Sequence, residues 1–293
     1  MNFYDDNPVR ARTNAPDLSR LLKRNLGFAL VAFLAATQVS AKPVIVLDPG
    51  HEPSMVGAIS SCQKPEYKYN EEMVGYILKA LRPDYTVVVT RKFGHDMTTT
   101  GLKNYVKPEY QQEWAKEKSL LARAAIANRI HAAIFISIHH DSVPEKDLYF
   151  DHKICHGKGG MRITPSFEAH HKIGFNVFIY DHAAKIRKMR SLKLARIVGK
   201  NIEALGRIPS NYHIYPVEPC ASCQVVDKSL GVYSEDLAVL KATNMPAILI
   251  EVGNILDPRD ARAVSTPEFR TAFSKAIAKS LRQYFKAVGK PSR

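Results

Sequence analysis

The regular alternation of short apolar runs with amphipathic helical patterns constrains the fold more than any other feature of this sequence. The apolar, β-rich runs lie at residues 43–47, 85–89, 133–138, 175–180 and 246–250, and the helical patterns lie at 70–82, 119–131, 191–205 and 267–287. Strands that alternate with helices favour an α/β fold, in which a mostly parallel, twisted sheet carries helices on both faces. No internal repeat or low-complexity linker divides the chain, so we expect a single domain over residues 42–288 and a short tail over 289–293.

Local patterns also predict where the helices begin and where the loops lie. The pattern at 70–82 predicts a helix with five apolar residues on one face: Met73, Val74, Ile77, Leu78 and Leu81. The 119–131 pattern begins at Ser119, a candidate N-cap, and "STPE" at 265–268 has the form of a capping box with proline in the first turn. The irregular stretches 143–172 and 207–235 predict loops over one end of the sheet, where functional residues usually lie.

The N-terminal segment predicts export. Residues 1–25 are polar and carry Arg20, Lys23 and Arg24 near their end, and an apolar run of 16 residues follows at 26–41. That run is shorter than the roughly 20 residues that span a membrane, and "VSA" at 39–41 offers small residues for signal peptidase. We therefore expect residues 1–41 to be a signal peptide or a membrane anchor, and the protein to be periplasmic or secreted. A buried core helix is the weaker alternative, because the run directly abuts the first strand.

The charge of the chain is strongly basic. The net charge is +14, and residues 1–41 hold five Lys or Arg and three Asp or Glu, so the remainder keeps about +12. A basic surface suits nucleic acid, an anionic membrane or an anionic cell wall. No basic run interleaved with aromatic residues marks a nucleic-acid groove, so we expect no nucleic-acid partner and membrane contact only through the N-terminal segment.

Four cysteines, Cys62, Cys155, Cys220 and Cys223, agree with export. In an oxidising compartment an even count favours two disulfides, although the pairing cannot be deduced from sequence. The "CASC" segment at 220–223 could form a local bridge, half of a zinc site or a redox pair. A zinc site would need a second cysteine pair at similar spacing, and a redox pair should open a helix after a strand, whereas this segment has the pattern of a loop.

Three of the apolar runs lead directly into chemical groups. In "KPVIVLDPGH" the strand stops at Asp48, turns at Pro49-Gly50 and presents His51; "AIFISIHHDS" leads into His139 and His140, and "PAILIEVGN" into Glu251. Ligands of open α/β sheets bind outside the carboxyl ends of the strands, where these side chains would gather. Two histidines and a carboxylate are the parts of a catalytic zinc site. Taken singly, such a histidine is more often a hydrogen-bonded loop residue, and such a glutamate is more often solvated.

From residue 43 to about 286 the sequence resembles the zinc-dependent N-acetylmuramoyl-L-alanine amidases of the amidase type 3 family, which cleave peptidoglycan. The pieces that carry the resemblance are, in order, "VIVLDPGH", "GAISSCQKPEYKYN", "VVVTR", "SLLARAAIAN", "AIFISIHHDS" and "LAVLKATNMPAILIEVGNI", followed by the closing helix. The family usually has GHGG after the first strand, whereas this chain has "GHEP". The resemblance implies that residues 42–288 are a catalytic domain that binds one zinc ion at the carboxyl ends of the strands.

The resemblance also implies the ligand set. The family's metal-binding glutamate lies about fifteen residues after the first histidine and four before an asparagine that opens a helix, which corresponds to Glu66 and Asn70. Glu71 and Glu72 are alternatives, but they fall within a helical pattern where paired charges usually face solvent. The "SIH" of the family maps onto His139. The metal ligands are therefore expected to be His51, Glu66 and His139, and His140 is expected to line the pocket or to pack.

The same resemblance assigns roles to three further residues. Glu251 would take a proton from the attacking water and pass it to the leaving amine. Asp48 would either hydrogen-bond His51 and orient it, or serve only to form the turn before Pro-Gly. Arg123 matches an arginine of a family helix, and we interpret it as a structural residue that forms ion pairs within the fold.

The substrate that the resemblance implies is the amide between N-acetylmuramic acid and L-alanine in peptidoglycan. A zinc peptidase that acts within the stem peptide and a catalytically silent wall-binding module remain the alternatives. Some relatives carry a helix that blocks the zinc site until a protein activator removes it. We place such control in the segment 143–190, because of its basic stretch "AAKIRKMRSLK" at 183–193.

Overall fold

The structure, a computed structural model, describes residues 41–110, 117–142, 148–153, 155, 159–163, 174–210 and 223–289. The predicted leader at 1–41 lies outside these residues except for Ala41, as does most of the tail at 289–293. From Lys42 onward the chain forms one compact unit. Within the described ranges, no helix has the length and apolar character needed to cross a bilayer.

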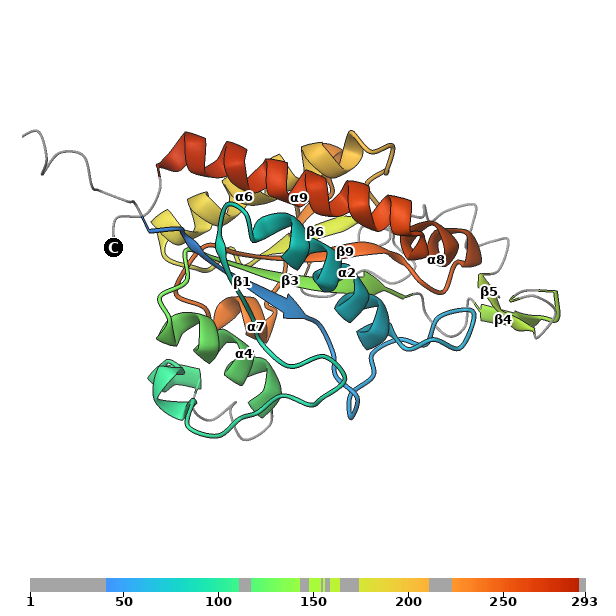
Figure 1. Ribbon diagram of the computed structural model, residues 1–293, viewed down its shortest axis with the longest axis horizontal. Coiled ribbons are helices and arrows are strands. Elements are labelled where there is room, and N and C mark those ends of the chain that lie inside the picture. The colour runs from blue at the N-terminus through green and yellow to red at the C-terminus, as the bar shows by residue number, and fades with distance from the viewer. Residues whose placement is uncertain are drawn as a thin grey trace, which may run out of the picture. The chain divides into compact units, whose positions relative to one another are not determined.

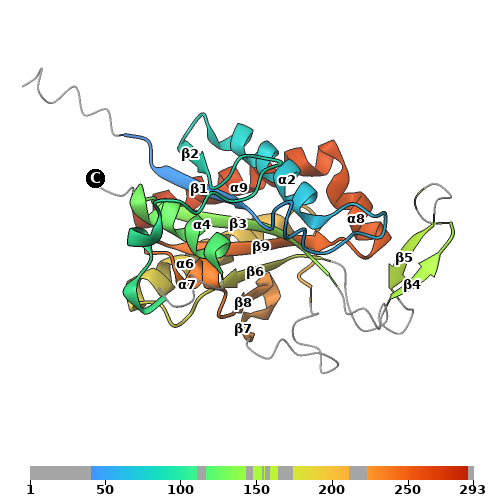
Figure 2. The same cartoon turned by 90° about the horizontal axis from the view of Figure 1, so that it is seen from below.

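The centre of this unit is a seven-stranded sheet in the order β2-β1-β3-β9-β6-β8-β7 (Figures 1 and 2). Its strands are β1 (Val44–Pro49), β2 (Thr86–Val89), β3 (Ile134–Asp141), β6 (Asn176–Ile179), β7 (Gln224–Asp227), β8 (Val232–Ser234) and β9 (Ala247–Asn254). The neighbours β2, β1, β3 and β9 are all parallel, and β8 is parallel to β6. The β6–β9 and β7–β8 pairs of the sheet are antiparallel. The predicted mostly parallel sheet is therefore confirmed.

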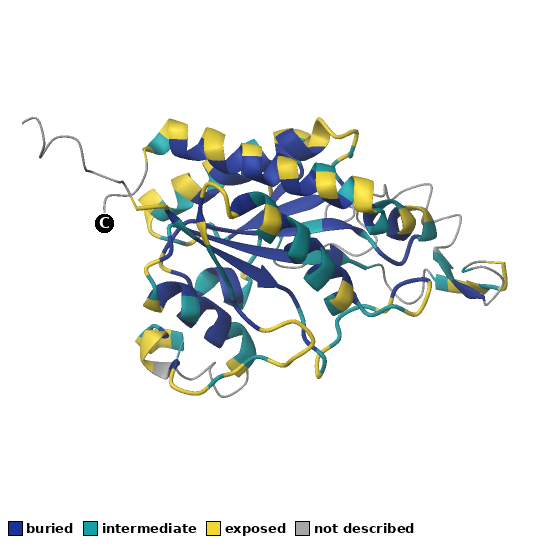
Figure 3. Cartoon of the chain, viewed as in Figure 1, coloured by how far each residue is buried: buried dark blue, intermediate teal, exposed yellow. Residues whose placement is uncertain are grey.

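Helices cover both faces of this sheet, as predicted (Figure 1). They are α2 (Glu66–Leu81), α4 (Lys118–Arg129), α6 (Lys185–Glu203), α7 (Ala238–Lys241), α8 (Pro258–Ser265) and α9 (Pro267–Val288), with short 3-10 turns at Lys103–Tyr105, Pro108–Tyr110 and Lys228–Leu230. Because strand side chains alternate between faces, Ile45 and Leu47 pack in a core with α2, α6 and α9, whereas Val46 packs in a second core with α4 and α7. Burial on both faces explains why these strands appear in the sequence as continuous apolar runs (Figure 3).

Several predicted helix starts are wrong by a few residues. α2 begins at Glu66 and α6 at Lys185, each earlier than the apolar pattern indicated. The hydroxyl of Ser119 does not cap α4, because it donates to Glu52 instead. The N-cap of α9 is Thr266, which accepts from the backbone of Phe269 at 3.1 Å. The predicted capping box therefore does not form at Ser265, which is the last residue of α8.

The stretches predicted as loops also contain strands. β4 (Leu148–Asp151) and β5 (Gly160–Ile163) form a separate antiparallel pair, and β7 and β8 lie within 207–235. A disulfide joins Cys62 to Cys155, with 5.5 Å between their Cα atoms. Cys223 is also in a disulfide, which excludes a zinc-binding thiolate there, and Cys220 lies outside the described residues.

Candidate metal centre

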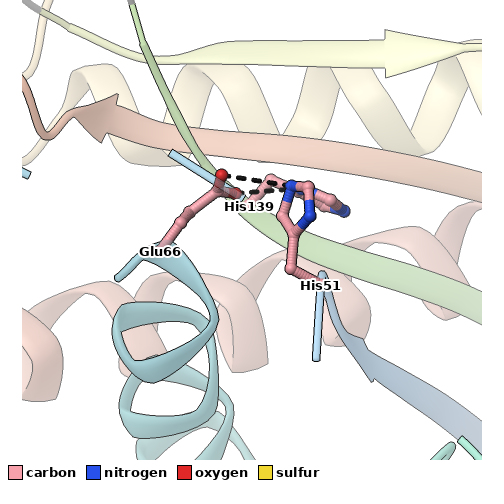
Figure 4. A group of neighbouring side chains, drawn as sticks. All are labelled: His51, Glu66 and His139. Carbon is pink, nitrogen blue, oxygen red and sulfur yellow. Dashed lines mark hydrogen bonds and ion pairs between the residues drawn. The ribbon is translucent and has the colours of Figure 1, made fainter. Parts of the chain in front are cut away.

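Three predicted ligands converge at the carboxyl edge of the sheet (Figure 4). His51 follows β1, Glu66 is the first residue of α2, and His139 lies near the end of β3. β1 and β3 are parallel neighbours, with Pro49 opposite Ile138, so both histidines emerge at the same edge. One ligand atom from each of the three side chains can be chosen so that all lie within 4.8 Å of one another.

The carboxylate of Glu66 lies between the two imidazoles. Its Oε2 is 3.1 Å from Nε2 of His51, and its Oε1 is 3.2 Å from Nδ1 of His139. Burial raises the pKa of Glu66, but the hydrogen bonds from His139 and His51 outweigh it and hold the pKa well below its ordinary value. The cluster therefore presents an ionised carboxylate and two imidazole nitrogens, which are the donors that a catalytic zinc site takes from a protein.

Two glycines leave the space that this cluster occupies. A Cβ atom at Gly50 would overlap the imidazole of His139. A Cβ atom at Gly57, whose φ is +74°, would lie 2.5 Å from Oε2 of Glu66 and 2.6 Å from Cδ2 of His51. The sequence assigned Gly50 only to a turn, whereas the structure shows that both glycines let the backbone approach the candidate ligands closely.

Glu71 and Glu72, the alternative ligands, are directed elsewhere. Glu71 forms an ion pair with the buried Arg91. Glu72 forms ion pairs with Lys64 and Arg270. Among the described residues, Glu66 is therefore the glutamate of α2 that joins the two histidines.

Asp48 does not orient His51 by a direct hydrogen bond, which makes that alternative wrong. Its Oδ1 accepts from Thr90 Oγ1 at 2.6 Å and from Arg123 Nη1 at 2.7 Å, and its Oδ2 accepts from Ser137 Oγ at 2.7 Å. Burial raises the pKa of Asp48, but the positive charge of Arg123 and these hydrogen bonds bring it below its ordinary value. Asp48 belongs to β1, before the turn, so its side chain points to the interior between the sheet and α4.

Arg123 is structural, as predicted, and it connects Asp48 to the backbone of His51, the first candidate ligand. The guanidinium is buried and donates to Pro49 O at 2.8 Å and to His51 O at 3.0 Å. Arg91 Nε donates to the same oxygen of His51 at 3.0 Å. His51 has a φ of 58°, an uncommon value for a residue other than glycine, and the two arginines fix its carbonyl in that conformation.

Glu52 stands where the family usually has glycine, and the structure gives it a role that the sequence did not predict. It is only 3% exposed. Its Oε2 accepts from Arg123 Nη2 at 3.1 Å, from Ser119 Oγ at 3.0 Å and from Met97 N at 2.9 Å. The "GHEP" loop is therefore held by a buried carboxylate.

Asn70 hydrogen-bonds the carboxylate of Glu66, and His140 hydrogen-bonds Asn70 in turn. The amide nitrogen of Asn70 donates to Gly50 O at 3.0 Å and to Glu66 Oε1 at 3.2 Å, and its oxygen lies 2.7 Å from Nδ1 of His140. Since that oxygen can only accept, Nδ1 of His140 carries the proton. Burial lowers the pKa of His140 to about 3, so the ring is neutral. His140 packs, as expected, and it also fixes the orientation of Asn70.

Glu251 lies next to His139 in the sheet, because the two residues are opposite each other in the β3–β9 register. β9 continues to Asn254, so Glu251 lies within the strand rather than at its end. Burial, followed by the charges of Asp141, Glu66 and Glu235, raises its pKa well above the ordinary value. Its Oε2 is buried and has no hydrogen-bond partner in the part of the chain that the structure describes. An unpaired carboxyl oxygen therefore lies beside the three-residue cluster.

The basic stretch at 183–193 does not cover this centre. It forms the start of α6, whose Leu194 and Val198 are fully buried in the main core. α6 follows β6, which runs antiparallel to β9 and therefore away from the edge that carries the cluster. Our interpretation of this stretch as an inhibitory cover is therefore wrong, while residues 143–147, 154, 156–158 and 164–173 of the predicted control segment lie outside the described residues.

Comparison with known proteins agrees with the geometry. Residues 45–283 match the family model described as N-acetylmuramoyl-L-alanine amidase. The chain belongs to this amidase family. It is an enzyme that hydrolyses the amide between N-acetylmuramic acid and L-alanine in peptidoglycan.

Relatives and solved structures share most of the length of this amidase. It is 24% identical over 284 residues to the germination-specific N-acetylmuramoyl-L-alanine amidase of Bacillus subtilis (strain 168), covering 91% of this chain and 94% of the relative. The apo Ami1 amidase of Mycobacterium abscessus has a TM-score of 0.57 at 19% identity, over 84% of this chain and 99% of that chain. The CwlD amidase of Clostridioides difficile, in complex with the GerS lipoprotein, has a TM-score of 0.55 at 16% identity, over 84% of this chain and 99% of that chain. These solved structures share the fold of the amidase.

Proposed function

We propose that the amidase depends on a single zinc ion held by His51, Glu66 and His139. The observation that carries the proposal is the convergence of these three side chains from separate elements, with their ligand atoms within 4.8 Å. The low pKa of Glu66 and the space left by Gly50 and Gly57 also fit a cation at this position. Three protein ligands are the number typical of a catalytic site, which keeps a position open for water or substrate.

Zinc supplies Lewis acidity, which lowers the pKa of a water molecule from 15.7 towards about 7 and polarises the scissile carbonyl. The protein's own residues do the rest. Glu66 and the two histidines fix the geometry, and the Asn70 amide keeps Oε1 of Glu66 in place. The buried arginines fix the backbone of His51, so that the site is arranged before the substrate arrives.

We further propose that Glu251 is the general base and acid. Its carboxylate would accept a proton from the attacking water and deliver it to the nitrogen of the leaving L-alanine. Its position opposite His139 and its unpaired buried oxygen support this role, because a proton acceptor must not be occupied by another donor. Burial, and then the nearby acidic groups, raise the pKa of Glu251, and a bound cation would oppose that effect.

The decisive experiment is digestion of purified peptidoglycan by residues 42–293, with added zinc, with a chelator, and with Glu251→Gln. We expect new L-alanine amino ends and peptide-free muramic acid from the parent with zinc. Chelation and Glu251→Gln should each reduce this rate by a factor of about 100 or more, since general acid–base catalysis contributes about 10²–10⁴-fold. Glu268→Gln, an exposed glutamate of α9, is the matched control and should cleave like the parent.

The same digestion tests the alternatives. Cuts between amino acids of the stem peptide would indicate the peptidase. Peptidoglycan binding without cleavage would indicate the silent module. Metal analysis of the purified protein gives a separate test, because a protein that holds no zinc would contradict the ligand set whatever its products.

Export and a protein partner also belong to the proposal. An activator is one part of the proposal, because a structural neighbour is described in complex with a lipoprotein.

We infer that residues 1–41 are a signal peptide or an anchor, that residues 42–288 are the catalytic domain, and that the enzyme acts in the periplasm or outside the cell. Cell fractionation and N-terminal sequencing of the mature protein would test the leader. A cytoplasmic protein that retains residue 1 would contradict it.

A further inference from the structure

The start of α6 exposes two large apolar side chains to solvent. Ile186 and Met189 are 67% and 60% exposed, the highest values for large hydrophobic side chains in the described ranges. They are three residues apart, so they lie on the same side of the helix. Leu194 and Val198 of the same helix are fully buried in the core, so Ile186 and Met189 lie on the opposite, solvent-facing side of α6.

Basic side chains surround this apolar pair. Lys185, Arg190 and Lys193 are exposed, and the sequence has no acidic residue between Asp181 and Glu203. Lys185 lies in the first turn of α6, where a cation opposes the helix dipole, so its charge does not stabilise the helix itself. An anionic partner would compensate these basic charges. We call Lys185, Ile186, Met189, Arg190 and Lys193 the α6 face.

The α6 face lies at the edge of the sheet opposite the metal centre. Because β6 is antiparallel to β9, the turn from β6 into α6 lies beside the amino ends of β1, β3 and β9. The metal centre lies at their carboxyl ends. β1 begins at the same edge of the sheet as α6 (Figure 1). α9 also ends at this edge, where Lys193 Nζ is 3.4 Å from Ala287 O.

We propose that the α6 face docks on a membrane surface containing anionic phospholipids. Ile186 and Met189 enter the boundary between headgroups and acyl chains, and the three cations contact lipid phosphates. A peptidoglycan strand would satisfy the charges, but it has no apolar layer to bury two aliphatic side chains. Docking by this edge directs the metal centre away from the membrane. The proposal goes beyond the amidase activity and does not depend on the zinc ligands.

Vesicle sedimentation tests the proposal. Residues 42–293 contain the whole described core and lack the predicted leader, so any binding comes from the domain itself. We expect binding to vesicles of phosphatidylglycerol and phosphatidylethanolamine, little binding to phosphatidylcholine alone, and weaker binding as salt rises. The double variant Ile186→Ser/Met189→Ser and the triple variant Lys185→Gln/Arg190→Gln/Lys193→Gln should each lower the partition coefficient about tenfold or more.

Matched variants outside the α6 face serve as controls. Ile208→Ser/Val225→Ser removes two aliphatic side chains that are 45% and 50% exposed, and Lys92→Gln/Lys153→Gln/Arg262→Gln removes three exposed cations. Both should bind vesicles like the parent, and thermal unfolding should show that every variant is folded. Absence of parent binding to anionic vesicles, or equal losses in the controls, would overturn the proposal. So would α6-face variants that lose binding to isolated peptidoglycan but bind vesicles like the parent.

Discussion

Replacing His140 by alanine should weaken metal binding while the domain stays folded. The imidazole of His140 does not belong to the candidate ligand set; it contacts Asn70, with its Nδ1 2.7 Å from the Asn70 side-chain oxygen. That contact turns the Asn70 amide nitrogen towards Gly50 O at 3.0 Å and Glu66 Oε1 at 3.2 Å. Without the imidazole, the amide is free to rotate and the carboxylate of Glu66 loses a fixed donor.

The expected magnitude follows from these contacts. Removing a group that supports a metal ligand typically lowers metal affinity by about 10–100-fold, which corresponds to about 1.4–2.7 kcal/mol. The metal-free domain loses one buried hydrogen bond, worth about 1 kcal/mol, and gains a cavity that costs about 2–3 kcal/mol. A domain stable by about 5–15 kcal/mol tolerates that loss in most of the range.

The assay is a double-mutant cycle on zinc affinity, measured by competition with a chromogenic chelator. His140→Ala and Asn70→Ala should each weaken zinc binding, and the double variant should bind no more weakly than the weaker single variant. The coupling energy should exceed about 1 kcal/mol, because both changes remove the same support. His182→Ala is the control, since its side chain is 72% exposed. Unchanged zinc affinity in folded His140→Ala, or additive losses, would show that His140 only fills space.

Three further predictions concern the frame of the site. Gly50→Ala should lower zinc affinity by at least about 100-fold in the same chelator assay, because the added Cβ would overlap the imidazole of His139. The control Gly75→Ala in α2, where no atom lies closer than 3.8 Å to the added Cβ, should bind zinc like the parent. Arg123→Met should lower the free energy of unfolding in urea by about 3–5 kcal/mol, because the buried carboxylates of Asp48 and Glu52 lose their ion pairs with Arg123. The control Arg129→Met, at an exposed arginine, should change that free energy by less than about 1 kcal/mol. The pKa of Asp48 is lowered in the folded state despite its burial, so the ionised carboxylate stabilises the fold above about pH 4, and this stabilisation is lost as the pH falls through the folded pKa. Asp48→Asn should therefore make the free energy of unfolding less dependent on pH in that range. An unchanged pH profile would contradict this assignment.

The sheet and the convergence of the two candidate histidines could be predicted because both depend on local sequence, whereas Glu66 was implied only by the resemblance to the amidase family. Central parallel strands are buried on both faces and appear as apolar runs, and their carboxyl ends meet at one edge. That rule brings His51 and His139 together from the strand pattern alone. The metal-binding role of these residues stays a prediction, and so does the catalytic role of Glu251.

The support of the site could not be predicted in this way because its partners are distant in the sequence. Asp48 and Arg123 are 75 residues apart, and Asn70 and His140 are 70 apart. Each contact depends on how a helix packs on the sheet, which hydrophobic periodicity does not determine. The start of α6 was predicted too late because its first turn is exposed and basic, so no apolar pattern marks it in the sequence.

The "GHEP" loop shows how a departure from a family pattern can be accommodated. The family pattern and this chain share the histidine, here His51 with a φ of 58°, and differ at the next residue, which is Glu52 in place of glycine. The carbonyl of His51 accepts from both Arg91 and Arg123, and Glu52 binds Arg123 in turn. These contacts therefore hold the backbone of His51 in its uncommon conformation. Since the same guanidinium also binds Asp48 within β1, the position of His51, the first candidate ligand, is fixed by the core of the sheet rather than by the loop alone.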